Sequence, residues 1–327
     1  MAKQVIKAYK GFEKDLSCRG FQYEIGKEYE QDGEILPCSN GFHACENPLD
    51  VLDYYGSIDN RFCEVEQSGT IVKNDDKAAS SKIKIKAEIG FVGLFKAGIE
   101  YLKELTNPDK VVKETKDASA ESGDSAKIGS SGDSAKIGSS GYSAKIGSSG
   151  DSAKIGSSGY SAKIGSSGDY AQIGSSGDSA KIGSSGDSAK IGSSGDYAKI
   201  GSSGDSAKIG SSGYSAKIGS SGYSAKIGSS GDYAQIGSSG DSAKIGSSGD
   251  YAKINSTGED SVICCAGHNS CVKAKQGSWI TLAEWEYSEE KKRYVPKCVK
   301  TEFVDGERIK ADTWYKLQDG EFKEVGE

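Results

Sequence analysis

The sequence predicts a mainly β protein, in which a parallel β-solenoid with about 18 residues per coil lies between an N-terminal α+β domain and a small C-terminal β cap. Residues 123–257 are fifteen unbroken copies of a nine-residue repeat. Its fourth residue is always Ala and its sixth is always Ile, so this i, i+2 pair points to one side of a strand. Its second, third and fifth residues vary, which indicates an exposed surface.

A flexible linker is the main alternative to a solenoid, because Gly-Ser-Ser-Gly strings are typical of linkers. One Ala/Ile pair buries too little area to order a segment, whereas stacked copies form continuous ladders. We expect two copies per coil, each with one Ser-Ala-Lys-Ile strand and one Gly-Ser-Ser-Gly corner, where glycine adopts dihedral angles closed to other residues. Three copies per coil is the alternative. The region resembles nonapeptide-repeat β-solenoids.

The repeat differs from the calcium-binding nonapeptide motif. Its Asp follows Gly directly, and Tyr replaces that Asp in four copies, which argues against a ligand role. Ice or surface binding by rows of serine hydroxyls is a further alternative, but an outward-facing lysine or glutamine lies in the middle of each predicted strand.

Tyrosine is the most informative variable residue of the array. It occupies the second position in four copies and the third in four others, Tyr170 and Tyr223 among them. With two copies per coil, six of the eight fall on one side, and they are the candidate protein-contact face: Tyr142, Tyr160, Tyr197, Tyr214, Tyr233 and Tyr251. Stacking for stability alone is the other interpretation.

The N-terminal domain, residues 1–116, mixes strand and helix signals. Residues 47–55 begin with Asn and Pro, which favours a helix, and apolar residues recur at helical spacing over 89–105, where a helix could cover the open first coil. Alternation predicts strands over residues 4–9, 21–25, 61–66 and 82–86.

Several N-terminal motifs support a resemblance over roughly the first 105 residues: Tyr9-Lys10-Gly11-Phe12, Cys18-Arg19-Gly20-Phe21-Gln22-Tyr23, Gly26-Lys27, and Gly41-Phe42-His43-Ala44-Cys45 followed by Pro48-Leu49-Asp50-Val51. Together they resemble an uncharacterised domain family of phage and prophage proteins. The resemblance implies a phage-linked origin and no particular chemistry.

An enzyme in this domain is the rival hypothesis. An early tyrosine, the Gly-Phe-His segment before a helix that ends at Tyr54-Tyr55, and Glu64 or Glu66 are similar in order to an ADP-ribosyltransferase. A nucleotide-binding motif is not evident. We therefore interpret His43 as a structural residue and Cys45 as a small core residue.

The solenoid is expected to end irregularly over 258–278. An inserted residue after Asn255 would shift the inward pairs to Val262/Cys264, then Val272/Ala274 and Ile280/Leu282. Four potential zinc ligands fall in eight residues, at a spacing that matches no well-known zinc module: Cys264, Cys265, His268 and Cys271. We therefore interpret them as structural.

A small antiparallel β domain is predicted for 279–327. Alternation favours strands over residues 281–287, 297–304, 307–310 and 313–317. Core packing is the expected fate of its tryptophans.

Composition excludes several function classes. The net charge is −6, and the array with thirteen lysines and eleven aspartates gives no nucleic-acid footprint. No apolar run suggests a membrane span or signal peptide, and eight scattered cysteines indicate reduced thiols. No pattern indicates a cofactor. We expect a cytoplasmic protein of a bacterial host, non-enzymatic and able to oligomerise, that acts as a rigid protein-binding scaffold or a spacer.

Overall fold

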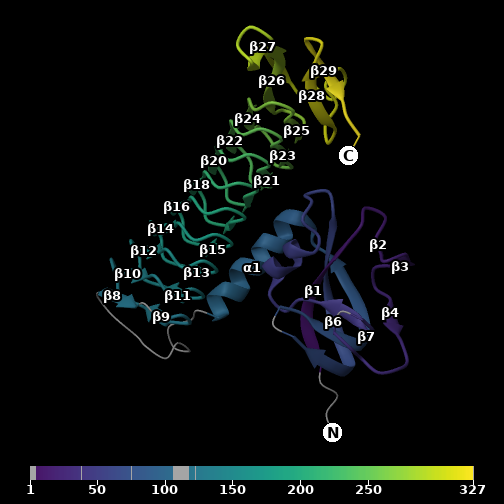
Figure 1. Cartoon of the computed structure of the whole chain (residues 1–327), viewed down its shortest axis with the longest axis vertical. Coiled ribbons are helices and arrows are strands. Elements are labelled where there is room, and N and C mark those ends of the chain that lie inside the picture. Colours follow the sequence, from purple (N-terminus) through teal and green to yellow (C-terminus); the bar gives the residue numbers. More distant parts are fainter. Residues whose placement is uncertain (1–4, 38, 75, 106–117, 122, 327) are drawn as a thin grey trace. The chain divides into compact units, whose positions relative to one another are not determined.

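The computed structural model describes residues 5–37, 39–74, 76–105, 118–121 and 123–326. The chain divides into two compact units, residues 1–101 and 102–327, which are considered separately (Figure 1). The predicted boundary at residue 116 lies outside the described residues. The seven cysteines that the structure describes are free thiols.

The first unit is built on an antiparallel sheet of order β1-β6-β7-β4, with β5 also paired to β7. Its two long strands, β6 and β7, extend well beyond the predicted segments and form its centre. A two-stranded ribbon, β2–β3, stands beside the sheet. The strand bounds are β1 Ile6–Phe12, β2 Ser17–Cys18, β3 Phe21–Gln22, β4 Glu28–Glu30, β5 Phe42–Ala44, β6 Arg61–Lys73 and β7 Ala78–Glu88.

Two helices complete this unit near their predicted positions. The first is a short 3-10 helix, η1 (Pro48–Asp53), whose N-terminus is capped by the Asn47 side chain accepting from the Leu49 N–H. The second is α1 (Gly90–Leu105). Its Phe91 ring lies 6.1 Å from that of Phe62, and Gly98 lies against Leu49. The apolar face of α1 thus packs within the first unit, and a capping role toward the solenoid stays a prediction.

The second unit contains the solenoid, and its strand pairing selects two copies per coil. Each array strand pairs in parallel with the strand two further along, so paired residues are 18 apart, as for Lys136 and Lys154. Two 11-stranded sheets result, here named the even sheet (β8, β10 and so on to β24, then β26 and β27) and the odd sheet (β9 to β25, then β28 and β29). The predicted parallel β-solenoid with about 18 residues per coil is confirmed.

The array strands recur every nine residues. Their bounds are β8 Ala118–Glu121, β9 Lys127–Ser130, β10 Lys136–Ser139, β11 Lys145–Ser148, β12 Lys154–Ser157, β13 Lys163–Ser166, β14 Gln172–Ser175, β15 Lys181–Ser184, β16 Lys190–Ser193, β17 Lys199–Ser202, β18 Lys208–Ser211, β19 Lys217–Ser220, β20 Lys226–Ser229, β21 Gln235–Ser238, β22 Lys244–Ser247 and β23 Lys253–Ser256. From β9 to β22 each strand is Lys-Ile-Gly-Ser or, in β14 and β21, Gln-Ile-Gly-Ser, rather than the predicted Ser-Ala-Lys-Ile. Strand β23 is Lys-Ile-Asn-Ser, and β8, which precedes the array, is Ala-Ser-Ala-Glu. The two-residue difference arises because the eighth residue, a serine, also points inward.

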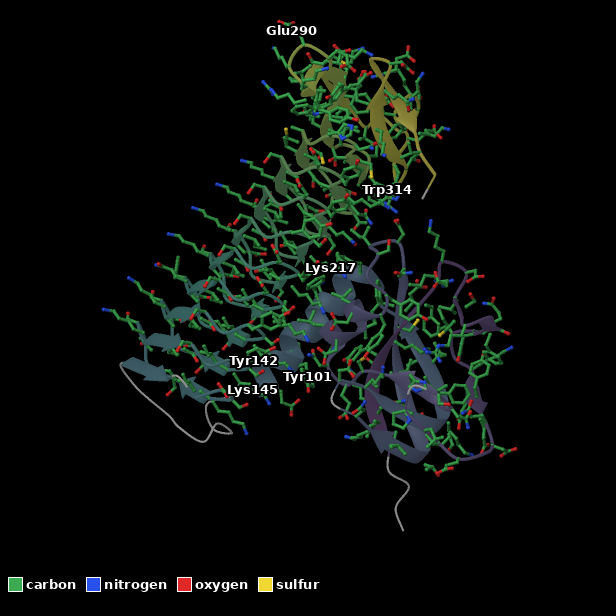
Figure 2. The ribbon with its side chains drawn as sticks, viewed as in Figure 1. Tyr101, Tyr142, Lys145, Lys217, Glu290 and Trp314 are labelled. Atoms are coloured by element: carbon green, nitrogen blue, oxygen red, sulfur yellow. The ribbon has the colours of Figure 1, made fainter. Side chains whose placement is uncertain are left out.

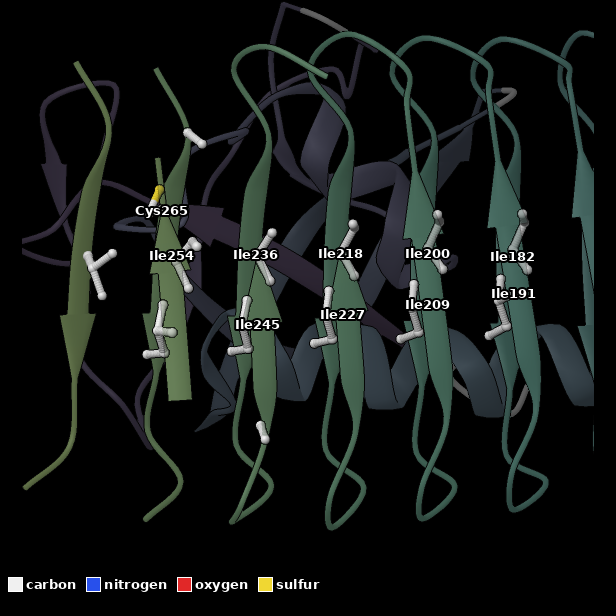
Figure 3. Packing of buried hydrophobic residues seen from close by; sticks show 14 of the residues in the cluster. Ile182, Ile191, Ile200, Ile209, Ile218, Ile227, Ile236, Ile245, Ile254 and Cys265 are labelled. Atoms are coloured by element: carbon white, nitrogen blue, oxygen red, sulfur yellow. The ribbon is translucent and has the colours of Figure 1, made fainter. Parts of the chain in front are cut away.

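The interior consists of three ladders per sheet, formed by the invariant Ala, the invariant Ile and the buried serine. Ile200 and Ile218 have no exposed surface, and Ile209 and Ile227 on the opposite sheet face them (Figure 3). The serines are nearly as buried, at 0% for Ser184 and 7% for Ser193. The core is narrow because two of its three layers are small residues.

The role predicted for the corner glycines is wrong. None of the described array glycines has a positive φ. In most copies the left-handed residue is the third of the repeat, a Ser or Tyr such as Ser206 (φ 57°) or Tyr233 (φ 57°). The first glycine is needed for another reason, which Gly204 illustrates. A Cβ atom there would lie 2.0 Å from the carbonyl oxygen of Gly186 in the preceding coil.

The final coils keep the 18-residue register longer than predicted. Strand β24 (Val262–Cys265) pairs with β22 through Lys244 and Val262, so no residue is inserted before it. Ile263 and Cys265 are consequently buried while Val262 and Cys264 are exposed, and the predicted inward pair Val262/Cys264 is wrong. Strand β25 (Cys271–Ala274) follows in register.

The register changes only at β26 (Trp279–Ser288), which pairs with β24 at an offset of 17 residues through Val262 and Trp279. The predicted inward pairs Val272/Ala274 and Ile280/Leu282 are both buried.

The C-terminal strands extend the two solenoid sheets. Strand β27 (Arg293–Phe303) lies antiparallel beside β26, and β28 (Trp314–Gln318) lies antiparallel beside β25 and carries β29 (Glu321–Glu324). The predicted strand over 307–310 is instead a bend, because the Asp305 carboxylate accepts the N–H groups of Glu307 and Ile309. Strand β29 was not predicted.

Candidate functional site

The six singled-out tyrosines lie at one edge of the solenoid, which we name the tyrosine edge. Each stands in the corner that precedes an odd-sheet strand, and each is 41–57% exposed. The members are Tyr142, Tyr160, Tyr197, Tyr214, Tyr233 and Tyr251. Tyr170 and Tyr223 stand in corners that precede even-sheet strands, at the opposite edge.

The rings of the tyrosine edge contact one another from coil to coil. Tyr142 and Tyr160 stack at 5.2 Å between ring centroids. After a coil with Asp178, a second row runs through the other four at centroid distances of 6.0, 5.1 and 4.9 Å, namely Tyr197, Tyr214, Tyr233 and Tyr251. The outer pairs, Tyr142/Tyr160 and Tyr233/Tyr251, stack in parallel, whereas Tyr197 meets Tyr214 edge to face. A large part of each tyrosine still faces solvent.

The second row continues into the C-terminal strands. Tyr251 meets the His268 ring at 5.7 Å, and His268 stacks on Tyr294 of β27 at 4.2 Å. Tyr294 in turn meets Tyr287 of β26 at 5.6 Å. The aromatic surface thus extends beyond the repeats from which it was predicted. His268 occupies the place in its coil that the second residue of the repeat occupies in the array.

Backbone conformation and hydrogen bonds hold these rings in place. Tyr233 is left-handed, and its N–H donates to the carbonyl of Asp250 in the next coil at 2.7 Å. Tyr214 occupies the second position, where its N–H donates at 2.7 Å to the carboxylate of Asp196 in the coil before. Burial first, then the neighbouring Tyr214 and Tyr251, raise the pKa of Tyr233.

The same aspartate-to-amide bond recurs along both edges and explains why Asp dominates the second position. On the opposite edge, Asp151 accepts from the N–H of Asp169, Asp169 from Asp187, and Asp187 from Asp205, at 2.8–3.0 Å. These carboxylates stabilise the stacking of coils. A tyrosine at this position still donates its N–H, but it offers no acceptor to the next coil.

The even sheet presents a second repeating surface. Its outward residues are a column of lysines, replaced by Gln172 in β14, then glycines, then serines. The first column forms a row of nitrogen-tipped side chains along β10 to β22 (Figure 2). On the even sheet the lysine side chains point to solvent, as predicted. On the odd sheet the lysines from β11 to β23 are partly buried, and Lys199 is buried at 4% exposed. A flat hydroxyl surface of the kind that ice binding needs is interrupted by this column at every coil.

The four potential zinc ligands do not converge. Cys264 and Cys265 are consecutive strand residues and point to opposite faces, one exposed and one buried. His268 stands in the aromatic row, and burial raises the pKa of the Cys265 thiol to about 12. Among the described residues, no group of three or more His, Cys, Asp or Glu side chains could hold a metal ion.

The first unit brings together part of the constellation considered for an enzyme. Tyr9, His43, Tyr54 and Tyr55 line one pocket between β1, β5 and η1. The glutamates do not line it: Glu64 pairs with Lys7 at 2.8 Å, and Glu66 pairs with Lys86 at 2.9 Å. Neither glutamate is therefore placed to act on a ligand in that pocket.

Comparison with known proteins concerns this first unit. A family profile described as Domain of unknown function (DUF7666) matches residues 6–97. No curated protein and no solved structure matches the chain. The matched segment agrees with the uncharacterised domain expected for the first 105 residues, and it assigns no activity. Within the described part of the chain, no helix is long and apolar enough to cross a membrane.

Sequence reasoning missed two features of the site. The hydrogen bond that an aspartate carboxylate accepts from a backbone amide of the next coil was not expected. The second position of the repeat holds only Asp or Tyr, and this restriction could have indicated it. The extension of the aromatic row through His268 and Tyr294 was also missed, because it requires the 18-residue register to continue past Asn255.

Proposed function

We propose that this chain is a non-enzymatic scaffold, whose solenoid holds the tyrosine edge rigid for contact with a protein partner. The observation that carries the proposal is the unbroken ring row from Tyr197 to Tyr251, exposed along successive coils. A rigid aromatic surface binds with little loss of side-chain entropy, and tyrosine adds a polar tip that can hydrogen-bond.

The chemistry of the edge favours a partner with arginine and apolar side chains. Beside the rings stand aspartates such as Asp196 and Asp232, whose corner positions give the edge an acidic character. Guanidinium groups stack on tyrosine faces and pair with carboxylates. The resemblance of the N-terminal residues to phage and prophage domains supports a role in the cytoplasm of a bacterial host.

Two matched variants test the proposal. In the first, all six tyrosines of the tyrosine edge are replaced by serine; in the control, Tyr170 and Tyr223 of the opposite edge are replaced by serine. Host proteins that co-purify with the unaltered chain are identified and quantified for each variant. We expect the six-site variant to lose a partner that the control retains. Equal retention by both variants would show that the chain acts as a spacer or binds elsewhere.

Photo-crosslinking gives a second readout that does not depend on complete loss of binding. A benzophenone side chain placed at position 214 should capture the partner, whereas one at position 223 should not. Circular dichroism of each variant confirms that the solenoid remains folded.

A further inference from the structure

The first unit contains a pocket of about 690 Å³, within the size range of small-molecule sites. Its walls come from β1, the β2–β3 ribbon, β4, β5 and η1, so five separate segments converge on it. Among its lining residues are one buried cation, Lys10, and a group of aromatic rings. These two features indicate what the pocket can bind.

Lys10 occupies a position where an apolar residue is expected. It lies on β1 between Ala8 and Phe12, which share its face of the strand and are both fully buried. Only 6% of Lys10 is exposed. A charged residue at such a position breaks the local pattern, and departures of this kind concentrate at functional sites.

The Lys10 ammonium has weak polar partners. Its Nζ donates to the carbonyl oxygen of His43 at 3.2 Å and to Cys18 Sγ at 3.4 Å. It also lies 5.3 Å and 5.9 Å from the ring centroids of Phe12 and Tyr23. In the described part of the chain no carboxylate pairs with it. A buried ammonium costs several kcal/mol unless an anion compensates it.

Other cations line the same pocket. Arg19 and Lys77 join Lys10, against two carboxylates, Glu13 and Glu30, of which Glu30 pairs with Lys82 at 2.8 Å. The pKa of His43 is lowered by burial first, and then by the positive charges of Lys10, Arg19 and Lys77. An anion that entered the pocket would relieve this positive charge.

A group of aromatic rings lines the pocket beside these cations. Phe21 and Tyr23 meet edge to face at 4.8 Å, Phe21 and Tyr29 at 5.4 Å, and Tyr23 and Phe42 at 6.5 Å. Phe21 is 47% exposed, although it is a large apolar residue. An exposed ring such as Phe21 can pack against a flat ring, by stacking or edge to face.

We propose that this pocket binds a small organic anion that carries a planar ring, with the anionic group beside the Lys10 ammonium and the ring against Phe21 and Tyr23. The site is independent of the tyrosine edge and of the scaffold role. Either can fail without affecting the other, because the two tests use different residues and different readouts.

The test follows the His43 ring resonances of the full-length chain by NMR. The chain has two histidines, so a His268→Gln variant assigns the signals. The ring-bearing anions are phenyl phosphate and adenosine 5′-monophosphate; inorganic phosphate, phenol and adenosine are the fragments. We expect at least one ring-bearing anion to shift the His43 signal saturably, to raise its pKa, and to bind at least tenfold more tightly than either of its fragments.

The matched variants are Lys10→Met and Lys7→Met, on the same strand, where Lys7 is exposed and outside the pocket. Lys10→Met should weaken binding at least tenfold, and Lys7→Met should leave it unchanged. If Lys10→Met does not fold, Arg19→Gln replaces it and should weaken binding several-fold. Absence of a saturable shift with both ring-bearing anions, or unaltered binding in the folded pocket variant, overturns the site. Equal affinity for inorganic phosphate and for the ring-bearing anions would overturn the proposed contact between the ligand's ring and the aromatic side chains.

Discussion

Gly204→Ala is the substitution that tests most directly how the coils stack. Its Cβ atom would lie 2.0 Å from the Gly186 oxygen, 2.5 Å from the Gly186 carbonyl carbon and 3.0 Å from the Asp187 nitrogen. All three are backbone atoms, so no side-chain rotation relieves the clash. The two coils must therefore separate locally.

The cost can be worked out from the bonds beside the clash. Two backbone–backbone hydrogen bonds between coils flank Gly204, from Ser203 N–H to Ser184 O at 3.0 Å and from Ser188 N–H to Asp205 O at 2.8 Å. Each contributes about 1 kcal/mol and costs about 1–3 kcal/mol if its buried groups are left unpaired. With overpacking strain of about 1–3 kcal/mol, we expect Gly204→Ala to destabilise the solenoid by about 3–5 kcal/mol.

Gly210→Ala is the matched control, because a Cβ atom there meets nothing within 4 Å and its φ is not left-handed. It should be neutral or stabilising by up to about 1 kcal/mol, since alanine loses less entropy on folding. Urea unfolding followed by circular dichroism, with hydrogen exchange to locate the opening, measures both variants. Equal stability of the two variants would refute the argument that close approach, rather than backbone conformation, selects glycine.

Three further predictions follow from individual contacts. Ser220→Ala removes a buried hydroxyl without a hydrogen-bond partner and should raise solenoid stability by up to about 1 kcal/mol in urea unfolding; a loss would show that the hydroxyl is bonded. A water-soluble maleimide should modify the exposed Cys264 quickly and Cys265 slowly, because burial raises the pKa of the Cys265 thiol to about 12; mass spectrometry of timed samples decides, and equal rates would contradict it.

The third concerns Glu284, whose pKa is lowered to about 2 by its hydrogen bond with Lys297 and by the Gly320 N–H. Its folded pKa lies below the unfolded value, so its stabilising contribution is present above about pH 4.5 and is lost as the pH falls toward 2. The Gly320 amide resonance should move over that interval, and Glu284→Gln should abolish the movement. A pH-independent resonance in the unaltered chain would contradict the assignment.

The sequence predicted the solenoid well because its signal is redundant. Fifteen identical Ala/Ile pairs predict one buried face, so local ambiguity averages out. The strand position was two residues off, because serine is usually exposed and nothing in a single copy marks Ser202 as buried. The bend at Asp305 was misread as a strand because alternation alone does not reveal a side chain that bonds its own backbone.

The candidate sites were predictable to different degrees. Six tyrosines could be placed on one edge from the period together with the expected two copies per coil, since the coil length fixes which copies share a side. The pocket around Lys10 could not, because its walls come from five segments whose meeting depends on the packing of β1, β5 and η1.

The sequence by itself determined the repeat and the Ala and Ile ladders, because these depend only on local period and on the need to bury apolar surface. The strand pairing of the folded chain decided between two and three copies per coil. The tertiary structure alone decided why the first glycine is invariant and why Asp dominates the second position. Both depend on the approach of backbone atoms 18 residues apart, such as Gly186 and Gly204. A contact between coils leaves only one trace in the sequence, which is the residue type that it permits at a repeat position. The sequence does not show which atoms approach one another.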